Sequence, residues 1–99
     1  VDFFALGQLT FERPDVETFR GLALAYEAAR TGGTMPTVFN AANERAVALF
    51  LQKKIRFLQI PELIEASMRE HQVTQDPSVE KILETEQATY EFINRKFGE

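Results

Sequence analysis

The chain has 99 residues, of which 44% are hydrophobic and 26% are charged, as in one folded domain with a single core. Its formal net charge is −4 and its densest basic stretch holds only Lys53, Lys54 and Arg56, which argues against a nucleic-acid-binding domain with a basic face. It has no cysteine, no signal-peptide pattern and no tract of about 20 apolar residues, so disulfides, thiolate sites and a membrane span are excluded and we expect a cytoplasmic protein.

The first eleven residues, VDFFALGQLTF, predict an extended segment. Large apolar side chains occupy both odd and even positions of a period-two pattern, as in a strand that is covered on both faces. Because a lone strand without a ladder partner is unstable, we expect residues 1–17 to form a strand-like linker arm that meets other structure in a longer chain. An ordered N-terminal arm is the competing interpretation.

The first helix is predicted from about Arg20 to Thr31, with Thr18 as its N-cap. Gly32 and Gly33 supply the left-handed stop that commonly ends a helix. Apolar residues recur at steps of three and four, which predicts a stripe that faces the core. The stripe consists of Phe19, Leu22, Ala23, Tyr26 and Ala29.

The second helix is predicted from a cap at Thr34 to Lys54. Pro36 fits its first turn, where a missing N–H costs little, and the lysines at its end complement the helix dipole. The predicted core stripe consists of Phe39, Ala42, Ala46, Leu49 and Phe50.

Two further helical segments follow an apolar connection, IRFLQI. The stretch PELIEASMREH predicts a third helix with Leu63, Ile64, Ser67 and Met68 turned inward, and QVTQDPS has the composition of a turn. The last segment is predicted as a short helix from Ser78 to about Glu84, a break near Thr85, and a helix to Phe97, because the charged Glu86 interrupts its apolar stripe. Residues 18–99 are therefore expected to form a small all-α bundle of about four helices.

The polar residues of "NAANE" are the first candidates for chemistry. Asn40, Asn43 and Glu44 share one helix face at i, i+3 and i+4. Glu44 could hold a hard cation or act as a general base, but either role needs further oxygen ligands or partners. The favoured interpretation is structural: the amides hydrogen-bond nearby backbone, such as the RTGGT loop, and Glu44 pairs with a neighbour.

Other candidates are weaker. His71 is the only histidine and is expected at the surface, near the end of a helix. The carboxylates Glu62, Glu65, Glu70, Glu80 and Glu84 are mixed with basic residues, as on a solvated face, and Glu91 and Arg95 are expected to pair at i, i+4. Gly32-Gly33 lacks the rest of a phosphate-binding motif. No catalytic, cofactor-binding or metal-binding residue is therefore assigned.

The order of several motifs resembles a known family. LTFERPD, ALAYEAARTGG, FNAANERAVALFL, IRFLQIPELIE and SVEKILETE follow one another as in the C-terminal domain of 1-deoxy-D-xylulose 5-phosphate reductoisomerase. The similarity runs from about Asp2 to the end of the chain. Arg20 is a mild departure, since the family often has proline where the first helix opens.

The resemblance implies a domain of a homodimeric enzyme. That enzyme converts 1-deoxy-D-xylulose 5-phosphate to 2-C-methyl-D-erythritol 4-phosphate in non-mevalonate isoprenoid biosynthesis, with NADPH and Mg²⁺ or Mn²⁺. Its nucleotide, metal and substrate motifs have no counterpart here, so the resemblance implies a non-catalytic domain that braces the catalytic domain and linker of a bacterial enzyme. The arm would be the family's linker, and Asn40, Asn43 and Glu44 match a motif of its helical domain.

Two other functions stay open at the level of the sequence. One is an independent helical protein–protein interaction module, which would prefer a foreign partner. The other is a small metal-dependent enzyme centred on Glu44, which would bind Mn²⁺ tightly and lose that binding in Glu44→Ala.

Overall fold

A computed structural model describes the backbone of residues 16–97 and the side chains of residues 20–97. This part of the chain contains no β-strand. Its helices are α2 (Val16–Thr31), α3 (Met35–Leu51), the short 3-10 helix η1 (Phe57–Gln59), α4 (Ile60–Glu70) and α5 (Val79–Phe97). The prediction of an all-α bundle with about four helices is confirmed. The predicted strand-like arm lies outside the described residues, except that residues 16 and 17 belong to α2.

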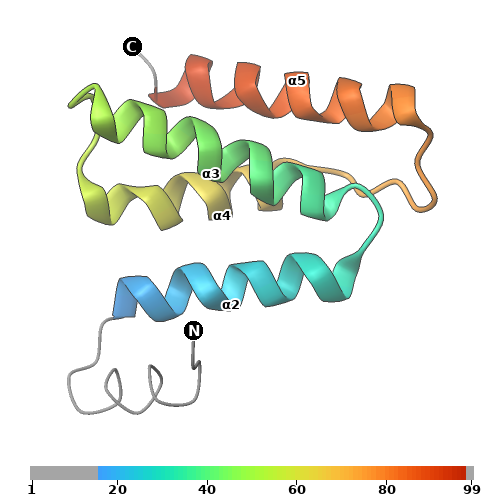
Figure 1. The fold of residues 1–99 in the computed structure, drawn as a ribbon, viewed down its shortest axis with the longest axis horizontal. Coiled ribbons are helices and arrows are strands. Elements are labelled where there is room, and N and C mark those ends of the chain that lie inside the picture. Colours follow the sequence, from blue (N-terminus) through green and yellow to red (C-terminus); the bar gives the residue numbers. More distant parts are fainter. Residues whose placement is uncertain (1–15, 98–99) are drawn as a thin grey trace.

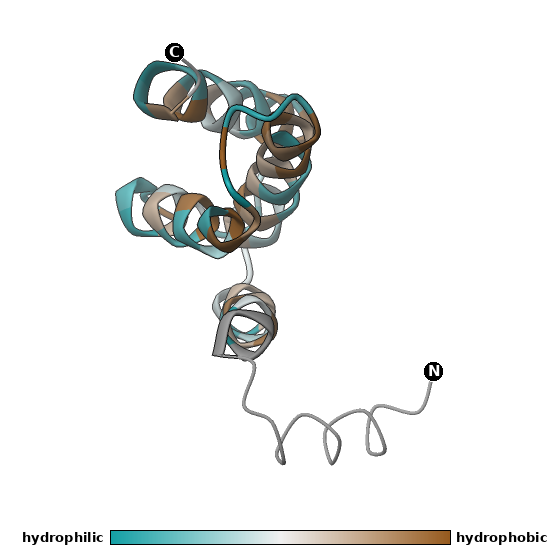
Figure 2. Ribbon diagram, turned by 90° about the vertical axis from the view of Figure 1, so that its left-hand side faces the viewer, coloured by the Kyte–Doolittle hydropathy of each residue, from teal (hydrophilic) through white to brown (hydrophobic). Residues whose placement is uncertain are grey.

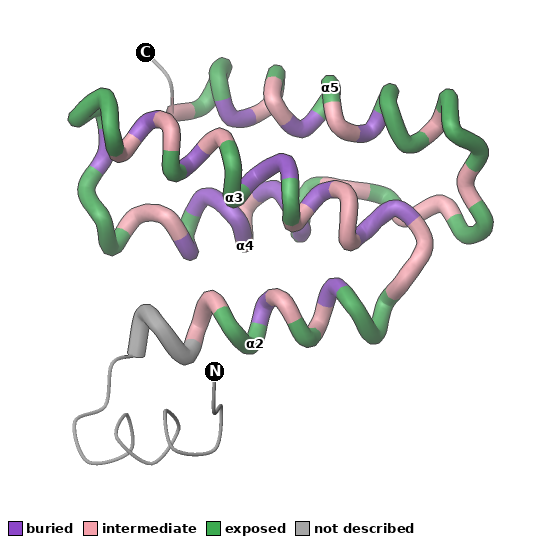
Figure 3. Tube along the Cα trace, viewed as in Figure 1, coloured by how far each residue is buried: buried purple, intermediate pink, exposed green. Residues whose placement is uncertain are grey.

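The helices form three layers. α3 and α4 pack together in the middle, α5 lies along one side of this pair and α2 along the other (Figures 1 and 2). Buried positions recur along all four helices (Figure 3). The core that they build consists of Leu24, Ala28, Met35, Val38, Ala42, Ala46, Leu49, Ile55, Leu63, Ile64, Met68 and Ile93.

The middle pair follows the sequence prediction closely. Ala42, Ala46 and Leu49 are fully buried, and Phe39 and Phe50 pack against the core while partly exposed. The small alanines permit a close approach between helices, because their side chains do not hold the backbones apart. In α4 the predicted inward residues Leu63, Ile64, Ser67 and Met68 are all buried.

The ends of α3 differ from the prediction. Thr34 precedes the helix, but its side chain makes no capping hydrogen bond. At the other end the helix stops at Leu51 rather than Lys54, because Lys53 adopts the left-handed conformation with φ 63°. The N–H of Lys53 donates to Phe50 O and the N–H of Lys54 to Leu49 O, both at 2.9 Å. This pair of bonds is the Schellman arrangement that closes a helix, here with lysine in the position that glycine usually takes.

The predicted break in the last helix is wrong, since α5 is continuous from Val79 to Phe97. Thr85 and Thr89 are both buried. Their hydroxyls donate to the carbonyls one turn earlier, Lys81 O at 2.7 Å and Thr85 O at 2.9 Å. A threonine can therefore enter the core here, because its own helix satisfies its hydroxyl.

The predicted inner face of α2 is also wrong. The helix begins at Val16, four residues before the predicted start, so Thr18 lies inside it rather than at its N-cap. Among the described side chains of the helix, which do not include Phe19, Leu24 and Ala28 are buried, whereas Leu22, Tyr26 and Ala29, on the opposite side, are exposed. The helix thus carries apolar residues on both sides, and packing against α3 and α4 selects only one.

Candidate functional site

The polar residues of the NAANE motif lie on the exposed side of α3. Asn40 and Asn43 are both exposed, and neither side chain forms a hydrogen bond within the described part of the chain. The expectation that these amides hold the RTGGT loop is therefore wrong. Glu44 is exposed as well, but it pairs with a neighbour as expected: its carboxylate accepts a hydrogen bond from the Tyr90 hydroxyl of α5.

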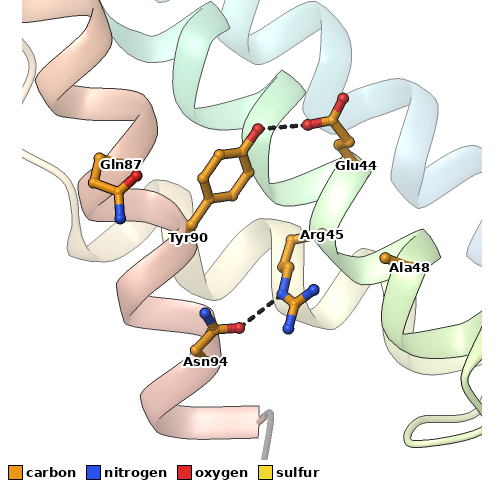
Figure 4. Close-up of a pocket in the computed structure, with 6 residues that line it drawn as sticks. All are labelled: Glu44, Arg45, Ala48, Gln87, Tyr90 and Asn94. Carbon is orange, nitrogen blue, oxygen red and sulfur yellow. Dashed lines mark hydrogen bonds between the residues drawn. The ribbon is translucent and has the colours of Figure 1, made fainter.

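Glu44 and Tyr90 line an open groove of about 440 Å³ between α3 and α5 (Figure 4). A second bond across the same groove joins Arg45 Nε to Asn94 Oδ1 at 2.7 Å. Both charged residues of α3 are thus engaged with side chains of α5. The lining of the groove consists of Glu44, Arg45, Ala48, Gln87, Tyr90 and Asn94.

The electrostatics of this groove favour a structural role. The hydrogen bond from Tyr90 to the Glu44 carboxylate, together with partial burial and the charges of Glu44 and Glu86, raises the pKa of Tyr90 to about 12. A phenol with that pKa stays protonated at neutral pH, where it can donate to the carboxylate but cannot serve as a base. The pair joins two helices, α3 and α5.

The loop after α2 is held by a different set of residues, centred on Thr34. Its side chain is fully buried. The N–H of Thr74 donates to Thr34 Oγ1 at 3.0 Å, and the N–H of Thr34 donates to Thr74 O at the same distance. His71 Nε2 lies 2.6 Å from the same hydroxyl oxygen. This cluster ties the loop after α2 to the loop after α4, a role that the sequence prediction gave to the asparagines.

His71 is half-buried in this cluster rather than at the surface as predicted. Desolvation, followed by the nearby positive charge of Lys81, lowers the pKa of His71 below its ordinary value of 6.5. A neutral ring suits the geometry, because the Thr34 hydroxyl accepts from Thr74 and retains its own proton for an unprotonated Nε2. The sequence favoured a protonated imidazole at this end of the helix, where the helix dipole stabilises a cation. Protonated His71 is instead the minor form at neutral pH.

The carboxylates of the described residues mostly pair with arginines or remain solvated. Glu27 accepts from Arg69 Nη1 at 2.5 Å and from Nη2 at 3.1 Å, and Glu65 accepts from Arg20 Nε at 3.1 Å. These bonds lower the pKa of both glutamates, through Arg69 for Glu27 and Arg20 for Glu65. The predicted pair of Glu91 with Arg95 does not form. Glu91 instead accepts from Gln87 at 3.2 Å.

The described side chains form no cluster of the kind that usually holds a divalent cation. Among residues 20–97, no three His, Cys, Asp or Glu side chains come together in a way that could hold a metal ion. Glu44, the best single candidate, already has Tyr90 as its partner. That no site residue lies in the chain stays a prediction, and no reaction step is assigned to these residues.

Comparison with known proteins identifies the family. A family model for the C-terminal domain of DXP reductoisomerase matches residues 1–92. The chain belongs to this family. The reductoisomerase of Agathobacter rectalis is 57% identical over 97 residues, covering 98% of this chain and 26% of that protein. The enzyme of a Thermoanaerobacter species is 56% identical over 97 residues, covering 98% and 25%.

The resemblance inferred from the motifs is thereby confirmed. The reductoisomerase of a Synechococcus strain shows the same relation: it is 55% identical over 86 residues, which cover 87% of this chain and 22% of that protein. The chain therefore spans about a quarter of the length of the reductoisomerases that it matches. None of the described helices has both the length and the apolar character needed to cross a membrane.

Proposed function

We propose that this chain is the non-catalytic C-terminal domain of a cytoplasmic, NADPH-dependent 1-deoxy-D-xylulose 5-phosphate reductoisomerase. The parent enzyme, a homodimer, would convert that substrate to 2-C-methyl-D-erythritol 4-phosphate in non-mevalonate isoprenoid biosynthesis, with Mg²⁺ or Mn²⁺ as its metal. The observation that carries this proposal is the family match, which extends over residues 1–92.

The contacts within the bundle support a bracing role for the domain. Glu44–Tyr90 and Arg45–Asn94 join α3 to α5, and the ion pair of Glu27 with Arg69 joins α2 to α4. Polar side chains that could have formed a binding site thus form bonds that join one helix to another. NADPH and the metal are proposed for the parent enzyme alone, and the residues of this chain have no step in its reaction. No observation favours the alternative of an independent interaction module.

Comparing the turnover of the chain with that of its parent tests the proposal. The 99-residue chain and the full-length protein are assayed for NADPH oxidation with 1-deoxy-D-xylulose 5-phosphate and Mn²⁺, after circular dichroism has verified that both are helical. We expect turnover by the parent and none by the helical chain alone. Turnover by the chain, or an inactive parent, would contradict the proposal.

Substitution of Glu44 in the parent tests its role separately. Glu44→Ala should leave kcat within a few-fold of the wild type once folding has been verified, with Gln87→Ala, which alters the same groove without removing a charge, as the matched control. A loss of about 100-fold or more, the scale of acid–base catalysis, confined to Glu44→Ala would place this carboxylate in the active site.

A further inference from the structure

The turn from α3 into α4 exposes large apolar side chains. Leu51 is 72% exposed, Phe57 58% and Leu58 56%. Of residues 51–58, which we call the tip, only Ile55 is buried. The tip lies at one end of the long axis of the bundle (Figures 1 and 3). Apolar exposure that is gathered in one place and mixed with polar residues marks an interaction surface.

The backbone of the tip is tied down by its own hydrogen bonds. The Schellman bonds described above close α3. The N–H of Gln59 donates to Arg56 O at 2.9 Å, and its Oε1 accepts from the N–H of Arg56 at 2.7 Å. The rings of Phe57 and Phe50 meet edge to face, with centroids 5.6 Å apart. Because Ile55 belongs to the core, the apolar residues on either side of it are held outward by an ordered turn.

The charges of the tip all have one sign. From residue 45 to residue 61 the chain has four basic residues and no acidic one. Three of the four, Lys53, Lys54 and Arg56, are exposed in the tip, and none of the three forms an ion pair within the described part of the chain. The whole chain has a net charge of −4, so the tip is a local excess of positive charge on an acidic protein.

The start of α5, at the opposite end of the bundle (Figure 1), offers a comparison. Val79 is 70% exposed there and Leu83 58%, as much as the apolar residues of the tip. These two residues alternate with the exposed acids Glu80 and Glu84, and the cation of the same turns, Lys81, pairs with Glu84 at 3.1 Å. Apolar exposure is thus combined with negative charge at that end and with unpaired positive charge at the tip.

We propose that the tip adsorbs reversibly to the surface of bilayers that contain anionic phospholipids. Leu51, Phe57 and Leu58 would enter the boundary between headgroups and acyl chains, and the cations would lie at the headgroup phosphates. The strength of such binding scales with the buried apolar area plus the attraction to anionic lipids. This inference goes beyond the proposed function and does not rest on it.

The order of residues in the tip suits a bilayer better than another partner. Apolar residues and cations alternate along one short turn, so both kinds reach the same surface. Lysine and arginine can lay their stems along an apolar phase while their charged ends stay at its polar boundary. Three cations are few for a nucleic-acid site or for a polybasic anchor, so the apolar side chains have to supply the rest of the binding, and the contact is weak.

Co-sedimentation of the full-length protein with vesicles tests the proposal. Vesicles of phosphatidylcholine, with and without anionic phosphatidylglycerol, are compared at about 0.05 M and about 0.5 M salt, between which the Debye length falls roughly threefold. One double variant, Leu51→Gln with Leu58→Gln, removes two apolar side chains from the tip and keeps its cations. Its matched control, Val79→Gln with Leu83→Gln, removes two equally exposed apolar side chains from α5. Circular dichroism verifies that each protein is helical.

We expect the wild type to sediment with anionic vesicles in low salt, and at least about tenfold less with phosphatidylcholine alone or in high salt. The tip variant should bind anionic vesicles at least about fivefold less than the wild type, and the α5 variant should stay within about twofold of it. The lipid and salt comparisons use the wild-type protein, so they test the proposal even where a variant fails to fold.

Several results would overturn the proposal. A wild-type protein that does not sediment with anionic vesicles would do so, as would equal binding to phosphatidylcholine alone or equal losses in the two double variants. Retention on heparin without vesicle binding would assign the tip to a polyanion that lacks an apolar phase, and the proposal would be wrong. The measurement is sedimentation rather than turnover, so none of these results depends on whether the protein is a reductoisomerase.

Discussion

At the scale of single residues, Thr34 and Asn43 show how differently two polar side chains contribute to the same loop and helix. Thr34 is fully buried, and its one hydroxyl contacts both Thr74 N–H and His71 Nε2. Asn43 is exposed and has no partner among the described residues. The stability of the loop after α2 therefore depends on the threonine.

Substitution at these two positions should separate their roles. Thr34→Val keeps the shape of the side chain but leaves the Thr74 N–H without its acceptor, so we expect a loss of about 1–3 kcal/mol in the free energy of unfolding. Asn43→Ala, the control, should stay within about 0.5 kcal/mol of the wild-type chain. Urea denaturation of the 99-residue chain measures both. A larger loss for Asn43→Ala than for Thr34→Val would reverse the assignment.

The single histidine makes a pH-dependent contribution to stability. The pKa of His71 is lowered in the folded chain, so the unfolded chain binds the proton more readily and protonation favours unfolding. This contribution is complete above the ordinary pKa of 6.5 and decreases as the pH falls from there toward the folded pKa. We expect the urea midpoint to fall as the pH is lowered from about 7.5 to about 5.5, a range that spans the start of this titration.

The His71→Gln variant is the control for this pH dependence. In this variant the urea midpoint should change much less over the same pH range. Glu27 and Glu65 do not titrate in that range, because their pKa values are lowered below 4.5. An NMR titration of the wild-type chain should follow one imidazole with a midpoint below 6.5. A midpoint above that value would show that the ring is stabilised as a cation.

At the scale of helices and loops, the two glycines after α2 are not equivalent to the glycine within it. Gly32 and Gly33 have φ of 70° and 56°, and a Cβ added at Gly33 would collide with Thr74 O. That oxygen is the acceptor for Thr34 N–H, so the close approach is part of the loop contact. Gly21 lies inside α2, and a Cβ added there would meet no atom within 4 Å apart from its chain neighbours and the backbone of its own helix.

Alanine should therefore have opposite effects at these positions. Gly33→Ala combines a left-handed backbone with a steric clash against a main-chain oxygen, and should destabilise the chain by more than about 1 kcal/mol. Gly21→Ala should stabilise it by about 0.5–1 kcal/mol, the difference in helix propensity. Thermal unfolding followed by circular dichroism measures both. If Gly33→Ala stabilised the chain, the loop after α2 and the loop after α4 would have to lie farther apart than they do in the structure.

At the scale of the whole molecule, the described part of α2, residues 20–31, buries less apolar surface than α3. Among the described side chains of α2, the buried apolar residues are Leu24 and Ala28, whereas α3 buries Met35, Val38, Ala41, Ala42, Ala46 and Leu49. The ion pairs that attach α2 to α4 are partly exposed, and such pairs contribute little. Local opening should therefore reach α2 before α3.

Hydrogen exchange should reveal this difference between layers. In the 99-residue chain, the amides in the middle of α2 should exchange at least about tenfold faster than those in the middle of α3, since opening of α2 exposes less apolar surface. Exchange measured by NMR under native conditions resolves the two helices. Equal protection of α2 and α3 would indicate that the bundle opens only as a unit.

Several features follow from the sequence by itself. Its composition and its three- to four-residue periodicity predict an all-α bundle, and the apolar stripes of α3 and α4 identify their buried residues, such as Ala46 and Leu63. The motifs also identify the family, because their order along the chain can be read without a structure. These features depend on local spacing, which the sequence states directly.

Other features were decided only by the tertiary structure. α2 has apolar residues on both sides, and contact with α3 and α4 determined that Leu24 rather than Leu22 is buried. Thr85 continues α5 because its hydroxyl finds a carbonyl within the helix once the side chain is buried. Thr34 and Thr74 are forty residues apart in the sequence, so no periodicity could pair them. Such contacts depend on which surfaces meet in space, and that is settled only when the helices pack.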